Sequence, residues 1–433
     1  MQDGLRRSLR LRDGLAVVIG ITVGSGIFRQ PGVVAAQLGR PYLTFIAWIL
    51  GGVVAFAGAL IFAELGTRLP QAGGKYVYAR EAFGPRAGFV AGVVEVGIYA
   101  VAIAAIAVVA GEYTSELVAL PAWGARAVGA GTVVLFTLVN LVGVAQGRFI
   151  QNLATAAKLV ALLGVVVIAF ARGTGAGWGQ SLPHAPTGTA TILALAVAFR
   201  AVVWSYYGYP DAAKIAEEVI DPERNLPKIF LGSIAAVTAL YLLLNAAFLH
   251  VLPFATVASS KLVAGDVATA IVGKSGGLVV AGLALLVVLA SINGNIFVTP
   301  RVVYAIARDG IGPSVLARVN RGGTPWAAFI VVGAAAIGLA IVGDFEQLFN
   351  IAIVLVMVID GATALALVRL RRRSVLQPAF SVPAFPLVVG GFVAIYGVLL
   401  ALAVYENPTL ALEAGGVLAG AAVSSVVWVN ARA

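Results

Sequence analysis

The amino-acid sequence predicts an all-α polytopic membrane protein with 12 transmembrane helices. The chain has 433 residues, of which 61% are hydrophobic and only 11% are charged, whereas about a quarter of the residues in a soluble domain are charged. Apolar stretches of about 20 residues, the length that crosses the hydrocarbon core of a bilayer, recur from one end of the chain to the other. No segment between them is long enough to form a soluble domain.

The apolar stretches define the expected helices. They lie at 14–37, 43–67, 87–112, 125–146, 151–171, 190–215, 229–251, 277–306, 325–343, 347–368, 385–405 and 411–431. The segment 74–84 is expected to form a short interfacial helix. These limits divide the chain into a cytoplasmic N-terminus at 1–13, five helices at 14–171, an extracellular loop at 172–189, five helices at 190–368, and helices 11 and 12 with a cytoplasmic C-terminus at 369–433.

The basic residues indicate how the chain is oriented. An even number of spans places both termini on one side, and most of the 29 lysines and arginines fall in the loops of that side, for example in 68–86, 301–321 and 369–373. The positive-inside rule then places both termini in the cytoplasm, so we expect an integral protein of the cell (inner) membrane. This distribution accounts for the net charge of +10 without a nucleic-acid partner.

Several kinds of chemistry are not expected. The chain has no cysteine and only two histidines, which are far apart in the sequence, so neither thiolate metal sites nor a histidine-based metal site is predicted. No Walker phosphate-binding loop is present, so ATP is not an expected partner. We therefore predict no cofactor, no metal and no enzymatic activity, since no clustered nucleophile and base suggests a membrane hydrolase.

Two of the predicted helices are interrupted near the middle of the membrane. Gly24 and Gly26 flank Ser25 in helix 1, and Gly208 with Pro210 interrupts helix 6. Proline cannot donate to the helical ladder, and glycine permits unusual backbone angles. Irregular backbone survives at this depth only where protein or a water-filled cavity supplies partners. Because the breaks are five helices apart, they indicate a 5+5 inverted repeat, with helices 11 and 12 outside it.

The two breaks suit a ligand that is charged at both ends. A helix that starts inside the membrane presents free N–H groups and partial positive charge, which attract a carboxylate. The carbonyls released at the other ends attract an ammonium. The expected substrate-binding residues are Thr22, Ser25, Gly26, Trp204, Ser205 and Tyr207.

Lys158 is a single cation in the middle of the fifth apolar stretch. A charged side chain in a bilayer core costs several kcal/mol, so an intramembrane lysine indicates a functional site. If carbonyls hold it, it stays charged and replaces a bound sodium ion; if it is poorly paired, it could lose and regain a proton during transport. The alternative is a lysine that extends to the membrane interface.

Several motifs resemble the amino acid–polyamine–organocation superfamily. They cover about residues 10–370 and comprise Gly24-Ser25-Gly26-Ile27-Phe28 with Pro31-Gly32, Ala63-Glu64-Leu65, Thr155-Ala156-Ala157-Lys158-Leu159, Ala216-Glu217-Glu218, Asp221-Pro222-Glu223-Arg224-Asn225-Leu226-Pro227 and Arg308-Asp309-Gly310. The resemblance implies a leucine-transporter-type fold with discontinuous helices 1 and 6.

The resemblance also implies roles for particular residues. Lys158 stands where sodium-coupled relatives bind their ion, and it should approach the carbonyls of Gly20 and Val23 and the hydroxyl of Ser291. Trp204 occupies the aromatic gate position. Tyr207 and Pro210 depart from the glycine and asparagine of the large-neutral-amino-acid exchangers, and the bulk of Tyr207 favours smaller substrates.

Three further charges lie at or near membrane depth: Glu95, Arg200 and Asp360. They could line the substrate cavity as gating or specificity residues. They could equally pair with one another as structural contacts, since buried charges are usually partnered. We expect the pairing.

These observations predict a sodium-independent secondary transporter that moves small or medium neutral amino acids by alternating access, either as an exchanger or as a proton-coupled symporter. A transporter of polyamines or organic cations on the same fold is the alternative, with Glu95 and Asp360 recognising amines. A channel or a membrane enzyme is more remote. The expected partners are the amino acid substrate, protons and the lipid bilayer.

Overall fold

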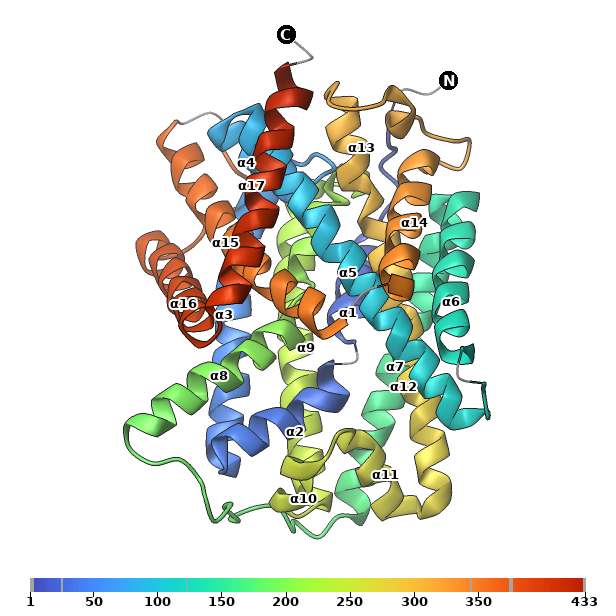
Figure 1. Cartoon of the computed structure of the whole chain (residues 1–433), viewed down its shortest axis with the longest axis vertical. Coiled ribbons are helices and arrows are strands. Elements are labelled where there is room, and N and C mark those ends of the chain that lie inside the picture. The colour runs from blue at the N-terminus through green and yellow to red at the C-terminus, as the bar shows by residue number, and fades with distance from the viewer. Residues whose placement is uncertain (1–3, 25, 122, 343–344, 374–376, 431–433) are drawn as a thin grey trace.

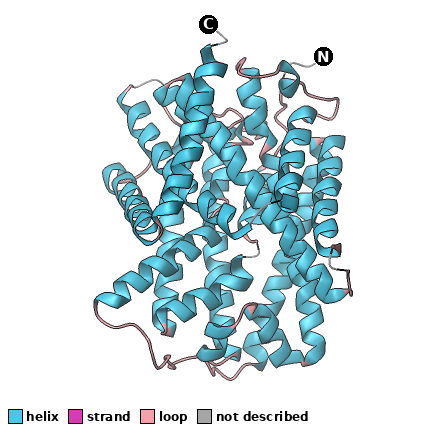
Figure 2. Cartoon of the chain, viewed as in Figure 1, coloured by secondary structure: helices cyan, strands magenta, loops and turns pink. Residues whose placement is uncertain are grey.

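The computed structural model describes residues 4–24, 26–121, 123–342, 345–373 and 377–430. Within these ranges the chain is helical and its only β-type contact is an isolated bridge between Leu9 and Val219. Figure 2 shows helices joined by loops throughout. The elements are α1 (Leu11–Thr22), α2 (Gly26–Leu38), α3 (Pro41–Arg68), α4 (Lys75–Phe83), α5 (Pro85–Leu117), α6 (Gly124–Val142), α7 (Val144–Arg172), α8 (Thr189–Tyr206), η1 (Tyr209–Ala213), η2 (Ala216–Glu218), α9 (Pro222–Val251), α10 (Phe254–Ser259), α11 (Val263–Val272), α12 (Lys274–Val298), α13 (Pro300–Arg308), η3 (Ser314–Ala317), α14 (Trp326–Val342), α15 (Phe345–Arg372), α16 (Phe385–Glu406) and α17 (Pro408–Asn430).

The structure confirms a polytopic helical membrane protein. In the described ranges, 10 helices are long and apolar enough to cross a bilayer, or 11 if α1 and α2 form one span. Each of the 12 predicted stretches contains a helix, but α14, at 325–343, has only 17 residues and is shorter than the usual span of about 20. The number 12 and the 5+5 repeat therefore stay predictions.

Both predicted interruptions are present. α1 ends at Thr22 and α2 begins at Gly26, and the axes of the two helices differ by 46°. α8 ends at Tyr206, and the chain continues through Gly208 into the 3-10 helix η1.

The bundle has two ends that differ in their connections (Figure 1). We call the end that carries α4, α13 and the last turns of α17 the terminal end, because the described chain also enters and leaves there. We call the opposite end, with α10, α11 and the loop 173–188, the loop end. The helices α10 and α11 were not anticipated, since 252–276 was expected to be a connection between spans.

The broken segments lie inside the bundle because small residues allow close approach, as is common between membrane helices. α1 packs on α7, α9 and α12, and α2 packs on α8. α3 approaches the second break closely: a Cβ atom built on its Gly58 would lie 2.2 Å from the Tyr209 hydroxyl. A larger residue there would push η1 away from the centre of the molecule.

Candidate functional site

The end of α1 releases carbonyl groups at the centre of the bundle. The Gly24 N–H donates to the Thr22 carbonyl at 2.9 Å, whereas continued α-helix would direct it to Gly20. The carbonyls of Gly20 and Val23 are then available to partners from other helices.

Lys158, on α7, is one of those partners. Its ammonium donates to the Gly20 carbonyl at 2.6 Å and to the Val23 carbonyl at 2.7 Å. The Ser291 hydroxyl, on α12, lies 3.5 Å from the same nitrogen. The lysine side chain is fully buried, so it does not extend to the membrane interface. These are the three partners that the family resemblance implied.

The two breaks contact each other directly. Gly208 has φ = +147°, which favours glycine, and a Cβ atom there would lie 2.4 Å from the Thr22 hydroxyl. The Tyr241 hydroxyl, from α9, lies 2.9 Å from the carbonyl of Thr22 and 2.8 Å from that of Ser205. A single buried tyrosine therefore connects the two broken helices.

A cavity of about 190 Å³ opens beside the breaks. It is lined by Ile21, Thr22, Gly24, Gly26, Arg29, Gln30, Ile98, Tyr99, Ala102, Ala105, Ile106, Val109, Trp204, Ser205, Tyr207, Gly208, Asp211 and Asn295. Its lining runs along α5 from Ile98 to Val109, away from the start of that helix beside α4, so the cavity lies on the loop-end side of the breaks.

The structure gathers most of the predicted binding residues around this cavity. Thr22, Gly26, Trp204, Ser205 and Tyr207 line it. The rings of Trp204 and Tyr207 stack, with centroids 6.2 Å apart and an interplanar angle of 11°. Ser25 lies outside the described residues. The lining of the cavity does not include Lys158 or its three partners, Gly20, Val23 and Ser291.

The expected pairing among Glu95, Arg200 and Asp360 is wrong. Their partners are residues that the sequence placed in loops or at helix ends: Glu95 lies 3.5 Å from Lys214, Asp360 lies 2.5 Å from Lys75, and Arg200 pairs with Glu406 at the end of α16. None of the three lines the cavity. The pairs form between residues that are close in the folded protein. For example, α4 packs against α15 and brings Lys75 next to Asp360.

The short helix at 74–84 was expected to be interfacial, and its burial against other helices was not anticipated. The helix is present as α4, but its first residue, Lys75, is 1% exposed. Lys214 and Arg301, which lie near the ends of the expected helices at 190–215 and 277–306, are 0% exposed. Hydropathy averages do not separate a loop that re-enters the protein from one that lies in water.

The sequence did not indicate several cavity residues. Gln30 follows the first break, Tyr99 lies on α5, and Asp211 follows the second break. Asp211 lies one turn of the 3-10 helix η1 after Gly208. This closeness to the second break is the signal that could have identified it. Arg29 is held by Glu112, with 2.7 Å between the charged atoms.

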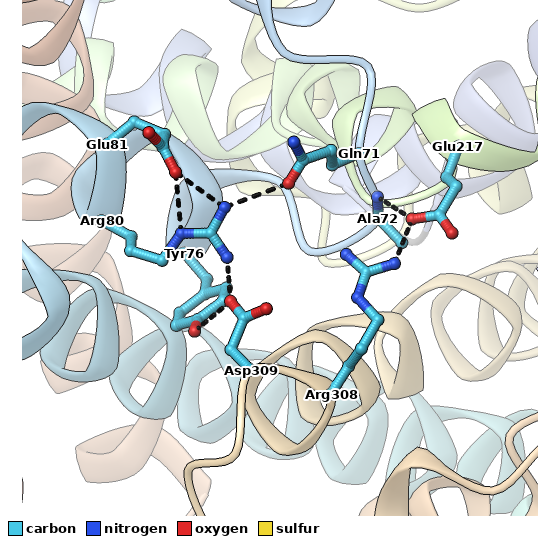
Figure 3. Close-up of polar contacts among 8 residues, drawn as sticks. All are labelled: Gln71, Ala72, Tyr76, Arg80, Glu81, Glu217, Arg308 and Asp309. Atoms are coloured by element: carbon cyan, nitrogen blue, oxygen red, sulfur yellow. Dashed lines mark hydrogen bonds and ion pairs between the residues drawn. The ribbon is translucent and has the colours of Figure 1, made fainter. Parts of the chain in front are cut away.

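The terminal end of the bundle is closed by polar contacts, shown in Figure 3. Asp309 accepts from the Tyr76 hydroxyl at 2.7 Å and pairs with Arg80. Glu217 accepts from Arg308 at 2.6 Å and from the Ala72 N–H at 3.0 Å. These contacts join the segment around α4 to η2 and to the end of α13.

A third ion pair, which is buried, strengthens this closure from inside. The guanidinium of Arg301, on α13, lies 2.7 Å from the carboxylate of Glu218, on η2, and both side chains are no more than 1% exposed. The ring of Phe297 lies 4.2 Å from the guanidinium carbon. The pair therefore fixes η2 against α13.

Comparison with known proteins agrees with this architecture. The amino acid permease family model matches residues 9–426. The chain is 30% identical to the serine/threonine exchanger SteT of Bacillus subtilis (strain 168), over 89% of this chain and 88% of that protein. It is 30% identical to b(0,+)-type amino acid transporter 1 of Mus musculus, over 89% and 80%, and 31% identical to Asc-type amino acid transporter 1 of Mus musculus, over 88% and 72%.

These relatives are transporters, and the match covers both helix breaks, the cavity and Lys158. Since the family model spans nearly the whole chain, the protein belongs to the amino acid permease family of the amino acid–polyamine–organocation superfamily and is an integral membrane transporter rather than an enzyme.

Proposed function

We propose that the protein is a sodium-independent amino acid transporter that works by alternating access in the cell membrane, with 12 spans, a 5+5 inverted repeat and both termini in the cytoplasm. One observation supports this most strongly. The cavity lies between two broken helices, and the buried ammonium of Lys158 binds the carbonyls that the first break releases. A fixed cation at this position makes a bound sodium ion unnecessary.

The ends of the broken helices suit the two charged groups of an amino acid. The first N–H groups of α2, beginning at Gly26, have no intrahelical acceptor, and the partial positive charge at that end attracts a carboxylate. The residues around Ser205 and Gly208 place backbone groups on the opposite wall. A substrate carboxylate would therefore lie at α2 and its ammonium toward the second break.

The size of the cavity indicates a small or medium substrate. Its volume of about 190 Å³ is below the roughly 300–1,000 Å³ typical of sites for drug-sized ligands. Trp204 and Tyr207 fill the wall on the side of α8. The similarity to a serine/threonine exchanger fits this restriction, and we propose small or medium neutral amino acids as substrates.

The contacts at the terminal end support a state of the transport cycle in which the cytoplasmic face is closed. With the termini in the cytoplasm, the contacts of Glu217 and Asp309 close the cytoplasmic face, and the cavity lies on the extracellular side of the breaks. The polyamine alternative receives less support, because Glu95 and Asp360, which were to recognise amines, do not line the cavity.

Replacing sodium with choline is expected to leave amino acid uptake unchanged. The ammonium of Lys158 supplies the positive charge in either buffer, so no site remains for the ion to fill. The measurement is uptake of a radiolabelled amino acid into vesicles that contain the purified protein. Strict dependence on sodium would refute the role of Lys158 as a substitute for the ion.

Replacing Gly26 with leucine is expected to abolish substrate binding. A Cβ atom at Gly26 would already lie 3.1 Å from the Ser205 hydroxyl, so a longer side chain fills the space between the breaks. A ligand that binds the native state raises apparent thermal stability by mass action, so the wild type should show a shift with its amino acid and the variant should show none.

The matched control for this variant is Gly97→Leu. Gly97 lies on α5, and a Cβ atom there meets nothing within 4 Å, so the same change in volume should leave the shift intact. An undiminished shift in Gly26→Leu would show that the substrate binds elsewhere.

A further inference from the structure

Besides the Arg301–Glu218 pair, a group of five charged side chains is buried between the cavity and the terminal end. They are Lys75 on α4, Glu95 on α5, Asp211 on η1, Lys214 directly after η1, and Asp360 on α15, and each is no more than 1% exposed. We call them the buried charge cluster. Three carboxylates face two ammonium groups, so the cluster has one negative charge too many when every member is ionised.

The distances locate the excess charge. Lys75 lies 2.5 Å from Asp360 and donates to the Tyr207 hydroxyl at 2.5 Å, so these two charges are balanced. Lys214 lies 2.7 Å from Asp211 and 3.5 Å from Glu95. A single ammonium therefore serves two carboxylates.

Two oxygen atoms show that the shared lysine does not satisfy both acids. Glu95 Oε2 and Asp211 Oδ2 are buried and have no hydrogen-bond partner among the described residues. The two oxygens of Asp360 also lack a hydrogen bond, but Asp360 Oδ1 lies 2.5 Å from the ammonium nitrogen of Lys75, which serves no second carboxylate at that distance. An unpaired carboxylate in the protein interior costs several kcal/mol, and two carboxylates that share one site cannot both ionise easily.

The lysines do not relieve this excess. Burial lowers the pKa of Lys75, but the negative charges of Asp360 and Glu95 outweigh it, so the pKa is raised and the ammonium keeps its proton. Lys214 lies between two carboxylates and against the ring of Tyr99, with its nitrogen 2.9 Å from the ring centre. Only an added positive charge completes the balance.

Among the residues that the structure describes, no other group around Glu95 supplies that charge. Lys75, Lys214, Asp211 and Asp360 are the charged side chains that act on it, from α4, α15 and the segment around η1. The neighbouring hydroxyl groups belong to Tyr78, Tyr99 and Tyr207. α6, α12, α13, α14 and α17 also pack on α5. The two arginines of α13, Arg301 and Arg308, are bound to Glu218 and Glu217, and Arg126, the charged residue of α6, is exposed.

We propose that Glu95, sharing Lys214 with Asp211, binds one proton while the cytoplasmic face is closed, and that this proton is transported together with the amino acid. Asp211 lines the cavity and gives the proton a route from the extracellular side. Glu95 and Asp211 belong to different helices, so movement of the second break away from α5 admits water to Glu95. A glutamic acid in contact with water is ionised at neutral pH, so Glu95 would then release its proton.

This inference rests on the proposed function and decides one point within it, namely proton symport rather than exchange. The test uses purified protein in vesicles that contain a pH-sensitive dye. Addition of an external amino acid should acidify the lumen of wild-type vesicles by about one proton per molecule taken up, because a single positive charge completes the cluster. Glu95→Gln should lose this acidification but still exchange labelled for unlabelled amino acid, and Glu95→Asp should restore it.

The matched control is Glu223→Gln, which removes an exposed carboxylate at the start of α9 and should acidify the lumen as the wild type does. Uptake by the wild type without acidification would overturn the proton site but leave amino acid transport intact. Absence of any amino acid uptake or exchange would instead overturn the proposed function. Acidification by Glu95→Gln at the wild-type rate would also overturn the assignment.

A second measurement needs no variant that could fail to fold. A hydrophobic carbodiimide reacts with protonated carboxyl groups, and peptide mass mapping of wild-type protein should find the label on Glu95. Incubating the protein at high pH before the reagent is added should remove the proton from Glu95 and reduce the labelling. Finding no label on Glu95 at neutral pH would overturn the proposal, because the residue would then hold no proton.

Discussion

Vesicles that contain Lys158→Ala are expected to show no amino acid transport, although the protein still inserts into the membrane. The variant removes the donor that binds the carbonyls of Gly20 and Val23. The Ser291 hydroxyl has one proton and can satisfy only one of them, so the other is left unpaired. A buried unpaired carbonyl costs about 1–3 kcal/mol, and about 1.4 kcal/mol corresponds to a tenfold change in a binding constant.

The measurement is uptake at saturating and at low amino acid concentration, with the amount of inserted protein determined from the same vesicles. Lys228→Ala is the matched control, because Lys228 lies exposed on α9 and its loss should not alter uptake. Wild-type flux in Lys158→Ala, with the wild-type response to pH, would contradict the proposed role of this lysine.

Replacing Arg301 with leucine is expected to cause the largest loss of stability. The variant leaves the carboxylate of Glu218 buried without its partner, and breaking a buried ion pair from one side costs about 3–5 kcal/mol. Thermal denaturation in detergent should show a clear fall in the midpoint. The double variant Arg301→Leu/Glu218→Leu should recover part of it, because no unpaired charge remains.

Arg308→Leu is the control for this prediction. Arg308 and Glu217 form an ion pair of similar length, but their side chains are 30% and 21% exposed. Water and salt weaken such a pair, and its contribution is about 0–1 kcal/mol. Equal losses in the two variants would show that burial does not set the strength of the Arg301 pair.

Much of the candidate site follows from short stretches of sequence. Gly24 and Gly26 in one apolar run, and Gly208 with Pro210 in another, locate the breaks because glycine and proline weaken a helix wherever they occur. Lys158 is conspicuous for a similar reason, since a charge in a span of apolar residues needs a partner. The family resemblance then implied its contacts with Gly20, Val23 and Ser291.

The partners of the other buried charges could not be obtained in this way. Glu95, Arg200 and Asp360 were expected to pair with one another, yet each binds a residue from a segment that hydropathy assigned to a loop or a helix end. Lys75 becomes buried only because α4 packs against α5 and α15. The burial of a residue depends on which other elements pack against it. Hydropathy averaged along the sequence contains no information about that packing.

The sequence by itself determined that this protein is an all-helical membrane protein with two interrupted spans. Those properties depend on the transfer of apolar side chains into lipid and on local backbone freedom, which are set by composition over about one span. Only the tertiary structure decided that Tyr241 bridges the two breaks, that Asp211 reaches the cavity, and that two lysines face three carboxylates. These contacts join residues far apart in the chain, and their energies depend on distance and on the exclusion of water, which exist only after the helices have packed.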